Sequence, residues 1–113
     1  MKRSFRIARV AAVGVVALML GCMSDNAVTN PPSQTMAVSI KGFAFNPASV
    51  VVPVGSTVTW TNQDATAHTV TATSFDSGSL AQNATFSHTF ATKGTFAYHC
   101  IFHSNMVASV TVQ

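Results

Sequence analysis

Short segments with strict two-residue alternation fill the chain from about residue 36 onward, and they restrict its fold more than any other feature. In STVTWTN, Val58 and Trp60 fall on one parity and threonines on the other, which is typical of a strand with one buried face. Similar β-branched or aromatic segments, bounded by turn residues, are MAVSIKGFAF, ASVVVPVG, HTVTAT, ATFSHTF, TFAYHC and MVASVTVQ. No segment has a convincing helical period. The pattern predicts an all-β fold: an antiparallel Greek-key β-sandwich or small barrel of about seven to eight strands.

The amino terminus has the composition of a bacterial export signal. Four basic residues precede the apolar run VAAVGVVALMLG, which is too short for a permanent membrane span. The run ends in LMLGC, which is similar to the lipobox of bacterial lipoproteins, where the cysteine is acylated and becomes the first residue. We therefore expect a signal peptide at 1–21, a lipidated Cys22, a flexible tether at 22–35 and one domain at 36–113. The alternative for Cys22 is an ordinary free thiol.

Lipidation would place the domain on the periplasmic side of a bacterial membrane or on the outer face of a Gram-positive cell. Met23 follows the cysteine, so the Asp signal associated with inner-membrane retention is absent and the outer membrane is favoured. Processing also changes the charge, because the remaining chain keeps two lysines against three aspartates, a net charge of −1. No basic stripe is left for a nucleic acid, so none is expected as a partner.

A thiol, an imidazole and a thioether follow one another at three-residue intervals in YHCIFHSNM. Strand alternation turns Cys100 inward and His99 outward, and the next three residues can carry His103 back over the sulfur. Met106 stands at the start of the last predicted strand. His68, just after the predicted loop NQDATA, is the natural fourth group.

These four side chains favour copper over other metals. One thiolate and two imidazoles with a distant thioether form the trigonal site with a weak axial ligand that is expected for copper in electron transfer. Zinc is more often held by four strong ligands. Coordination also accounts for a lone thiol in an exported domain, since the metal occupies the sulfur. The alternatives are a buried structural thiol at Cys100, a surface histidine at His68 and a core methionine at Met106.

Residues 36–113 resemble the cupredoxins, the small blue copper proteins, and the group of amicyanin, plastocyanin and pseudoazurin in particular. The resemblance rests on GTFAYHCIFHSNMVASVTV, with its Cys-x2-His-x2-Met spacing, and on FAFNPASVVVPVGSTVTWTNQDATAHTV. It implies that His68, Cys100, His103 and Met106 bind one type 1 copper. Thr69 stands where the family often has an asparagine that braces the ligand loop.

The resemblance implies a one-electron carrier, not an enzyme, cycling copper between Cu(II) and Cu(I). His103 would reach solvent among apolar residues and mark the place where redox partner proteins dock on a monomer. Two other functions stay open. Copper delivery or storage is one, although methionine-rich tracts are absent. The other is an enzyme subunit similar to copper nitrite reductases, because the pair His99-Cys100 occurs there; only four histidines are present to build a second copper site.

Overall fold

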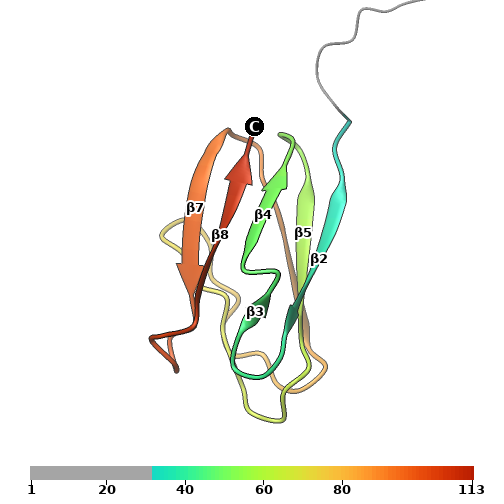
Figure 1. The fold of residues 1–113 in the computed structure, drawn as a ribbon. Helices are drawn as coiled ribbons and strands as arrows, with labels where there is room; N and C mark the ends of the chain where they lie inside the picture. Colours follow the sequence, from blue (N-terminus) through green and yellow to red (C-terminus); the bar gives the residue numbers. More distant parts are fainter. Residues whose placement is uncertain (1–31) are drawn as a thin grey trace, which may run out of the picture. The chain divides into compact units, whose positions relative to one another are not determined.

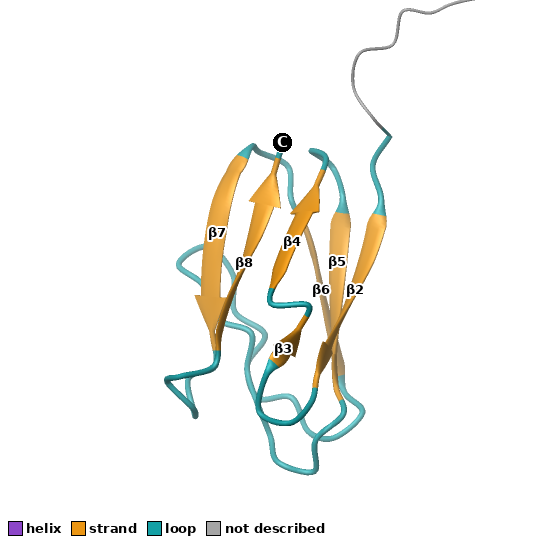
Figure 2. Ribbon diagram, in the orientation of Figure 1, coloured by secondary structure: helices purple, strands orange, loops and turns teal. Residues whose placement is uncertain are grey.

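Residues 32–113, the part of the chain that the computed structural model describes, hold seven strands in two sheets that pack face to face around the core (Figures 1 and 2). The strands are β2 (Thr35–Ile40), β3 (Phe45–Asn46), β4 (Ser49–Val52), β5 (Thr57–Asn62), β6 (Thr85–Thr89), β7 (Gly94–His99) and β8 (Val107–Val112). The all-β sandwich is therefore confirmed. The predicted signal peptide, Cys22 and positions 22–31 of the predicted tether lie outside the described residues. Residues 32–113 contain no helix long and apolar enough to cross a membrane.

The strand order corrects one prediction. One sheet runs β3-β2-β5-β6 and the other β4-β8-β7. Within them β2 pairs with β5 and β4 with β8 in parallel, so the sheets are mixed and the expectation of a purely antiparallel sandwich is wrong. The physical reason is that the chain crosses to the other sheet between β3 and β4 and returns at β5. Strands β2 and β5 are therefore neighbours without a hairpin between them.

Two of the predicted strands also differ from those observed. MAVSIKGFAF is not one strand, because Gly42 and Phe43 adopt positive φ angles of 64° and 58° and turn the chain between β2 and β3. HTVTAT forms only isolated bridges, from His68 to Leu80 and from Thr71 to Asp76 and His99. Its backbone bonds alternate between different segments, so no continuous ladder develops. This irregular segment supplies His68 and Thr69 to the site.

Alternation in the remaining strands produces the predicted core. Val58 and Trp60 on β5 are fully buried, whereas the threonines between them are half-buried. Trp60 packs edge-on against Tyr98 of β7, with ring centroids 5.4 Å apart. Burying an aromatic side chain of this size contributes about 2 to 3 kcal/mol. The largest core side chains thus hold β7, and with it Cys100 at the strand end, firmly in place.

Candidate metal centre

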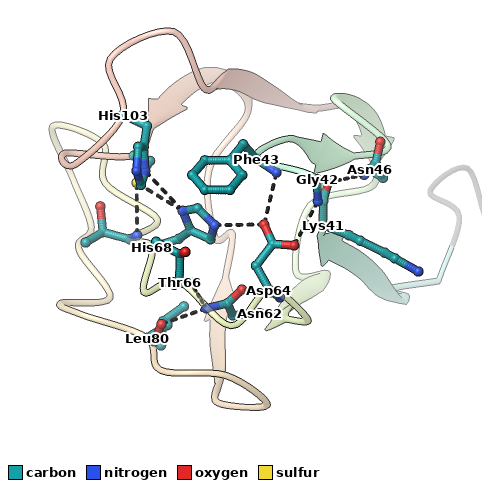
Figure 3. Close-up of polar contacts among 12 residues, drawn as sticks. Lys41, Gly42, Phe43, Asn46, Asn62, Asp64, Thr66, His68, Leu80 and His103 are labelled. Atoms are coloured by element: carbon teal, nitrogen blue, oxygen red, sulfur yellow. Dashed lines mark hydrogen bonds and ion pairs between the residues drawn. The ribbon is translucent and has the colours of Figure 1, made fainter.

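Three segments meet where β7 ends: the turn between β2 and β3, the loop after β5, and the loop from β7 to β8 (Figure 3). Cys100 is fully buried directly after β7, and His99 before it is exposed, as strand alternation predicted. The following loop is closed by two backbone hydrogen bonds. Met106 N donates to His103 O at 2.9 Å, and Cys100 N donates to Met106 O at 3.1 Å. Cys100 and the buried Met106 therefore stand at the two ends of a closed loop with His103 between them.

The two histidines and the cysteine bring their donor atoms together. Nδ1 of His68 lies 3.2 Å from Nδ1 of His103, and Sγ of Cys100 lies 3.8 Å and 3.6 Å from these two nitrogens. A point equidistant from the three atoms is about 2 Å from each, the length of a metal–imidazole or metal–thiolate bond. Within the described part of the chain, these residues form a group able to hold a metal ion. The triangle fits a single trigonal ion.

Asp64 fixes the orientation of His68, which is itself fully buried. The Nε2 atom of His68 lies 2.9 Å from Asp64 Oδ2. Hydrogen bonds from the backbone N–H groups of Phe43 and Gly42 and, to a smaller extent, the hydrogen bond from His68 hold the pKa of Asp64 below its ordinary value. An ionised carboxylate can only accept, so Nε2 carries the proton and the Nδ1 lone pair faces the sulfur. This is the tautomer that a metal at the centre of the triangle requires.

The loop that carries Asp64 and His68 is organised by one buried amide. Asn62 Nδ2 donates to the carbonyls of Thr66 (2.9 Å) and Leu80 (2.8 Å), while Asn62 Oδ1 accepts from Asp64 N (2.9 Å). Figure 3 shows the two bonds that Asn62 donates to Thr66 and Leu80. Because a buried amide is costly unless bonded, this set fixes the loop in one conformation.

Phe43 packs edge-on against the rings of both histidines. Its ring centroid lies 5.1 Å from that of His68 and 4.8 Å from that of His103, with interplanar angles of 84° and 80°. Both Asp64 oxygens accept backbone N–H bonds, from Gly42 and Phe43, at 2.9 Å. The carboxylate that orients His68 therefore also holds the turn that presents Phe43 (Figure 3).

Sequence reasoning missed both Asp64 and Phe43. An aspartate four residues before the first histidine was a usable signal, because such a side chain can reach the ring within one short loop. No pattern around Phe43 predicts its contact, since the contact depends on a positive φ angle and on the pairing of β2 with β5.

Thr69 contacts both Cys100 and the loop that follows it. Its backbone N–H donates to Cys100 Sγ at 3.3 Å, and its hydroxyl oxygen accepts from Ile101 N at 2.9 Å. The remaining histidines stand apart: His99 is exposed, and His88 stacks on Phe75 with ring centroids 4.5 Å apart. Neither belongs to the donor cluster.

Comparison with known proteins agrees with this geometry. A family model described as "Cupredoxin-like domain" matches residues 11–112. Amicyanin-alpha of Methylorubrum extorquens is 32% identical over 120 residues, which cover 97% of each chain. A Cu(I) structure of an amicyanin variant superposes with a TM-score of 0.66 at 28% identity, covering 70% of this chain and 82% of that one. A purple cupredoxin from Nitrosopumilus maritimus superposes with a TM-score of 0.65 at 30% identity, covering 69% and 99%.

The sandwich, the converging donor atoms and these similarities point to one assignment. The chain belongs to the cupredoxin-like family.

Proposed function

We propose that this protein is a one-electron carrier whose copper is bound by Nδ1 of His68, Sγ of Cys100 and Nδ1 of His103, with Met106 as the axial ligand. The observation that carries the proposal is the triangle of donor atoms, with sides of 3.2, 3.6 and 3.8 Å. One soft sulfur and two imidazole nitrogens suit both Cu(I) and Cu(II). When bound, the copper supplies the reversible one-electron step; no substrate is transformed.

The relatives support the same cofactor and role. The similar proteins include amicyanins and a purple cupredoxin, and at least three of the similar amicyanin structures are Cu(I) forms. Amicyanins are electron carriers, not enzymes. A carrier function accounts for a site built from one thiol and two histidines.

The residues around the ligands hold the donor atoms still. Asp64 fixes the ring of His68, the Thr69 N–H meets the sulfur of Cys100, and backbone bonds close the loop to Met106. A ligand set that is already in place rearranges little when the charge on the metal changes. Such preorganisation is what rapid electron exchange requires.

Electrons would enter and leave at His103. This side chain is half-buried and packs against Phe43, and Ile101 and Phe102 directly precede it in the chain. These three apolar residues are 49%, 56% and 53% exposed. We expect redox partner proteins to dock on this small apolar surface, because weak, brief complexes bury little area. The chain would act as a monomer.

We further expect export and attachment through an acylated Cys22. Several buried acyl chains, at about 0.8 kcal/mol for each methylene, are enough for stable anchoring. The tether at 22–35 would let the domain at 36–113 reach partners on the periplasmic side of a bacterial membrane, with the outer membrane favoured, or outside a Gram-positive cell.

The test is the visible spectrum and the reactivity of the Cu(II)-loaded protein. We expect an intense blue or purple thiolate-to-copper band that disappears in Cys100→Ser and persists in the control His88→Ala. Electron self-exchange should be much faster than transfer of copper to an acceptor protein or chelator. A colourless wild type contradicts the ligand assignment. Copper transfer faster than electron exchange would indicate delivery, and nitrite reduction lost in His99→Ala would indicate an enzyme.

A further inference from the structure

A chain of polar side chains links the ligand loop to a carboxylate outside the metal centre. We propose that Asp76 is a positioning residue for Cys100, acting through the hydroxyl groups of Thr71 and Thr69. The proposal rests on the assignment of Cys100 as a copper ligand.

Three hydrogen bonds of equal length form this chain. Ile101 N donates to Thr69 Oγ1 at 2.9 Å, Thr69 Oγ1 lies 2.9 Å from Thr71 Oγ1, and Thr71 Oγ1 donates to Asp76 Oδ1 at 2.9 Å. We call this set the Asp76 relay. It begins at the peptide bond that follows Cys100 and ends at an exposed side chain.

The direction of every bond in the Asp76 relay can be worked out. A hydroxyl group has one proton to donate. An ionised carboxylate only accepts, so Thr71 gives its proton to Asp76. The bond between the two threonines must then be donated by Thr69, and the oxygen of Thr69 is left with lone pairs facing the N–H of Ile101. Hydrogen bonds aligned in one direction polarise and strengthen one another.

Asp76 and Thr71 are each held by bonds outside the Asp76 relay as well. Gly78 N donates to Asp76 Oδ1 at 3.0 Å, and this bond, followed by the one from Thr71, keeps the pKa of Asp76 below its ordinary value. The backbone of Thr71 exchanges two hydrogen bonds of 2.9 Å with His99. Thr71 is therefore locked against the strand residue that precedes Cys100.

Thr69 connects the Asp76 relay to the sulfur. This buried residue contacts Ile101 through its hydroxyl and Cys100 Sγ through its N–H, at 2.9 Å and 3.3 Å. The first contact is made by the side chain and the second by the backbone, so a shift of the Thr69 backbone would alter both together. Hydrogen bonding around the cysteine sulfur is one of the factors that set the reduction potential of such copper sites.

The test is a double-mutant cycle in the copper-loaded protein, with the reduction potential as the readout. The variants are Asp76→Ala, Thr71→Val and the combination of the two. If Asp76 acts through the hydroxyl of Thr71, the Asp76→Ala substitution changes the reduction potential of the wild type. The same substitution changes the potential less than half as much in the Thr71→Val background. Equal changes in both backgrounds would overturn the proposal, because a charge acting through space does not need the hydroxyl.

Two further variants distinguish the hydrogen-bonding role of Asp76 from the effect of its charge. Thr71→Ser keeps the hydroxyl and should restore the full effect of Asp76→Ala. Asp76→Asn removes the charge but keeps an acceptor oxygen, so it should change the potential less than Asp76→Ala does. Identical changes in the Asn and Ala variants contradict the Asp76 relay.

Hydrogen exchange gives a readout that does not depend on electron transfer. The amide of Ile101 should exchange about fivefold faster in Asp76→Ala and in Thr71→Val, since its acceptor is no longer held in place. An unchanged rate in both variants overturns the proposal, even if their melting temperatures fall. Failure of the copper assignment is distinguishable, because it leaves the wild-type protein without its visible band; failure of the Asp76 relay alone leaves a coloured protein with additive potentials.

Discussion

Asp64→Ala is the substitution whose effect can be worked out most fully from the structure. The carboxylate accepts three hydrogen bonds of 2.9 Å, from His68 Nε2 and from the backbone N–H groups of Gly42 and Phe43. His68 is fully buried, and a buried donor left without a partner costs about 1 to 3 kcal/mol. The two amides lie at the surface, where water replaces the lost acceptor and each loss costs about 0.5 kcal/mol.

The three losses together amount to about 2 to 4 kcal/mol, and we expect a destabilisation of about 2 kcal/mol, at the lower end of this sum. The side chain of Asp64 is itself 15% exposed, so water can partly take its place beside His68. For a domain of this size the melting temperature should fall by about 10 °C. Copper affinity should fall about 10- to 100-fold, because the ring of His68 loses the group that fixes its tautomer.

Thermal melting and competition with a copper chelator measure these two effects. The matched control is Gln63→Ala, an exposed neighbour whose side chain makes only a 3.5 Å contact with Ser39; its effect should stay within about 0.5 kcal/mol. If Asp64→Ala and Gln63→Ala have the same stability and the same copper affinity, Asp64 does not hold His68 in the way described.

Three other predictions concern the surroundings of the site. Phe43→Ala should uncover both histidines and speed copper removal by a small chelator about tenfold, whereas Val51→Ala, an equally exposed residue on β4, should not. Tyr98→Phe should leave stability unchanged or raise it by up to about 1 kcal/mol in urea unfolding, because the buried Tyr98 hydroxyl has no hydrogen-bond partner within residues 32–113; a loss above about 1 kcal/mol would point to a partner. Acid should destabilise the wild type more than Asp64→Asn. The pKa of Asp64 is lower in the folded state, so its contribution is complete above about pH 4 and is lost as the pH falls through the folded-state value; parallel acid-unfolding curves would contradict this.

Alternation along the strands made much of the fold predictable. The burial of Val58, Trp60 and Tyr98 and the exposure of His99 follow from the two-residue period alone. The parallel pairing of β2 with β5 does not, because it depends on where the chain changes sheets. The break between β2 and β3 was not predicted, because Phe43 adopts a positive φ angle that its residue type disfavours.

The metal-binding residues of the candidate site were predictable from the sequence, but the residues that hold them in place were not. Close spacing brings Cys100 and His103 together through one short loop, and His68, 32 residues before Cys100, was a candidate from its place after a predicted loop that the resemblance to cupredoxins strengthened. Asp64 and Asp76 act through hydrogen bonds between segments that are distant from the ligand loop in sequence. Such contacts become visible only when the sheets have placed those segments side by side.

In the copper site proposed for this protein, one sulfur and two imidazole nitrogens bind the metal. X-ray absorption at the copper edge measures this directly in the loaded protein. We predict one short sulfur contact and two nitrogen contacts, all at about 2 Å, with the sulfur contact absent in Cys100→Ser. A wild-type spectrum with nitrogen and oxygen neighbours only, or with two sulfurs at equally short distance, would contradict this ligand set.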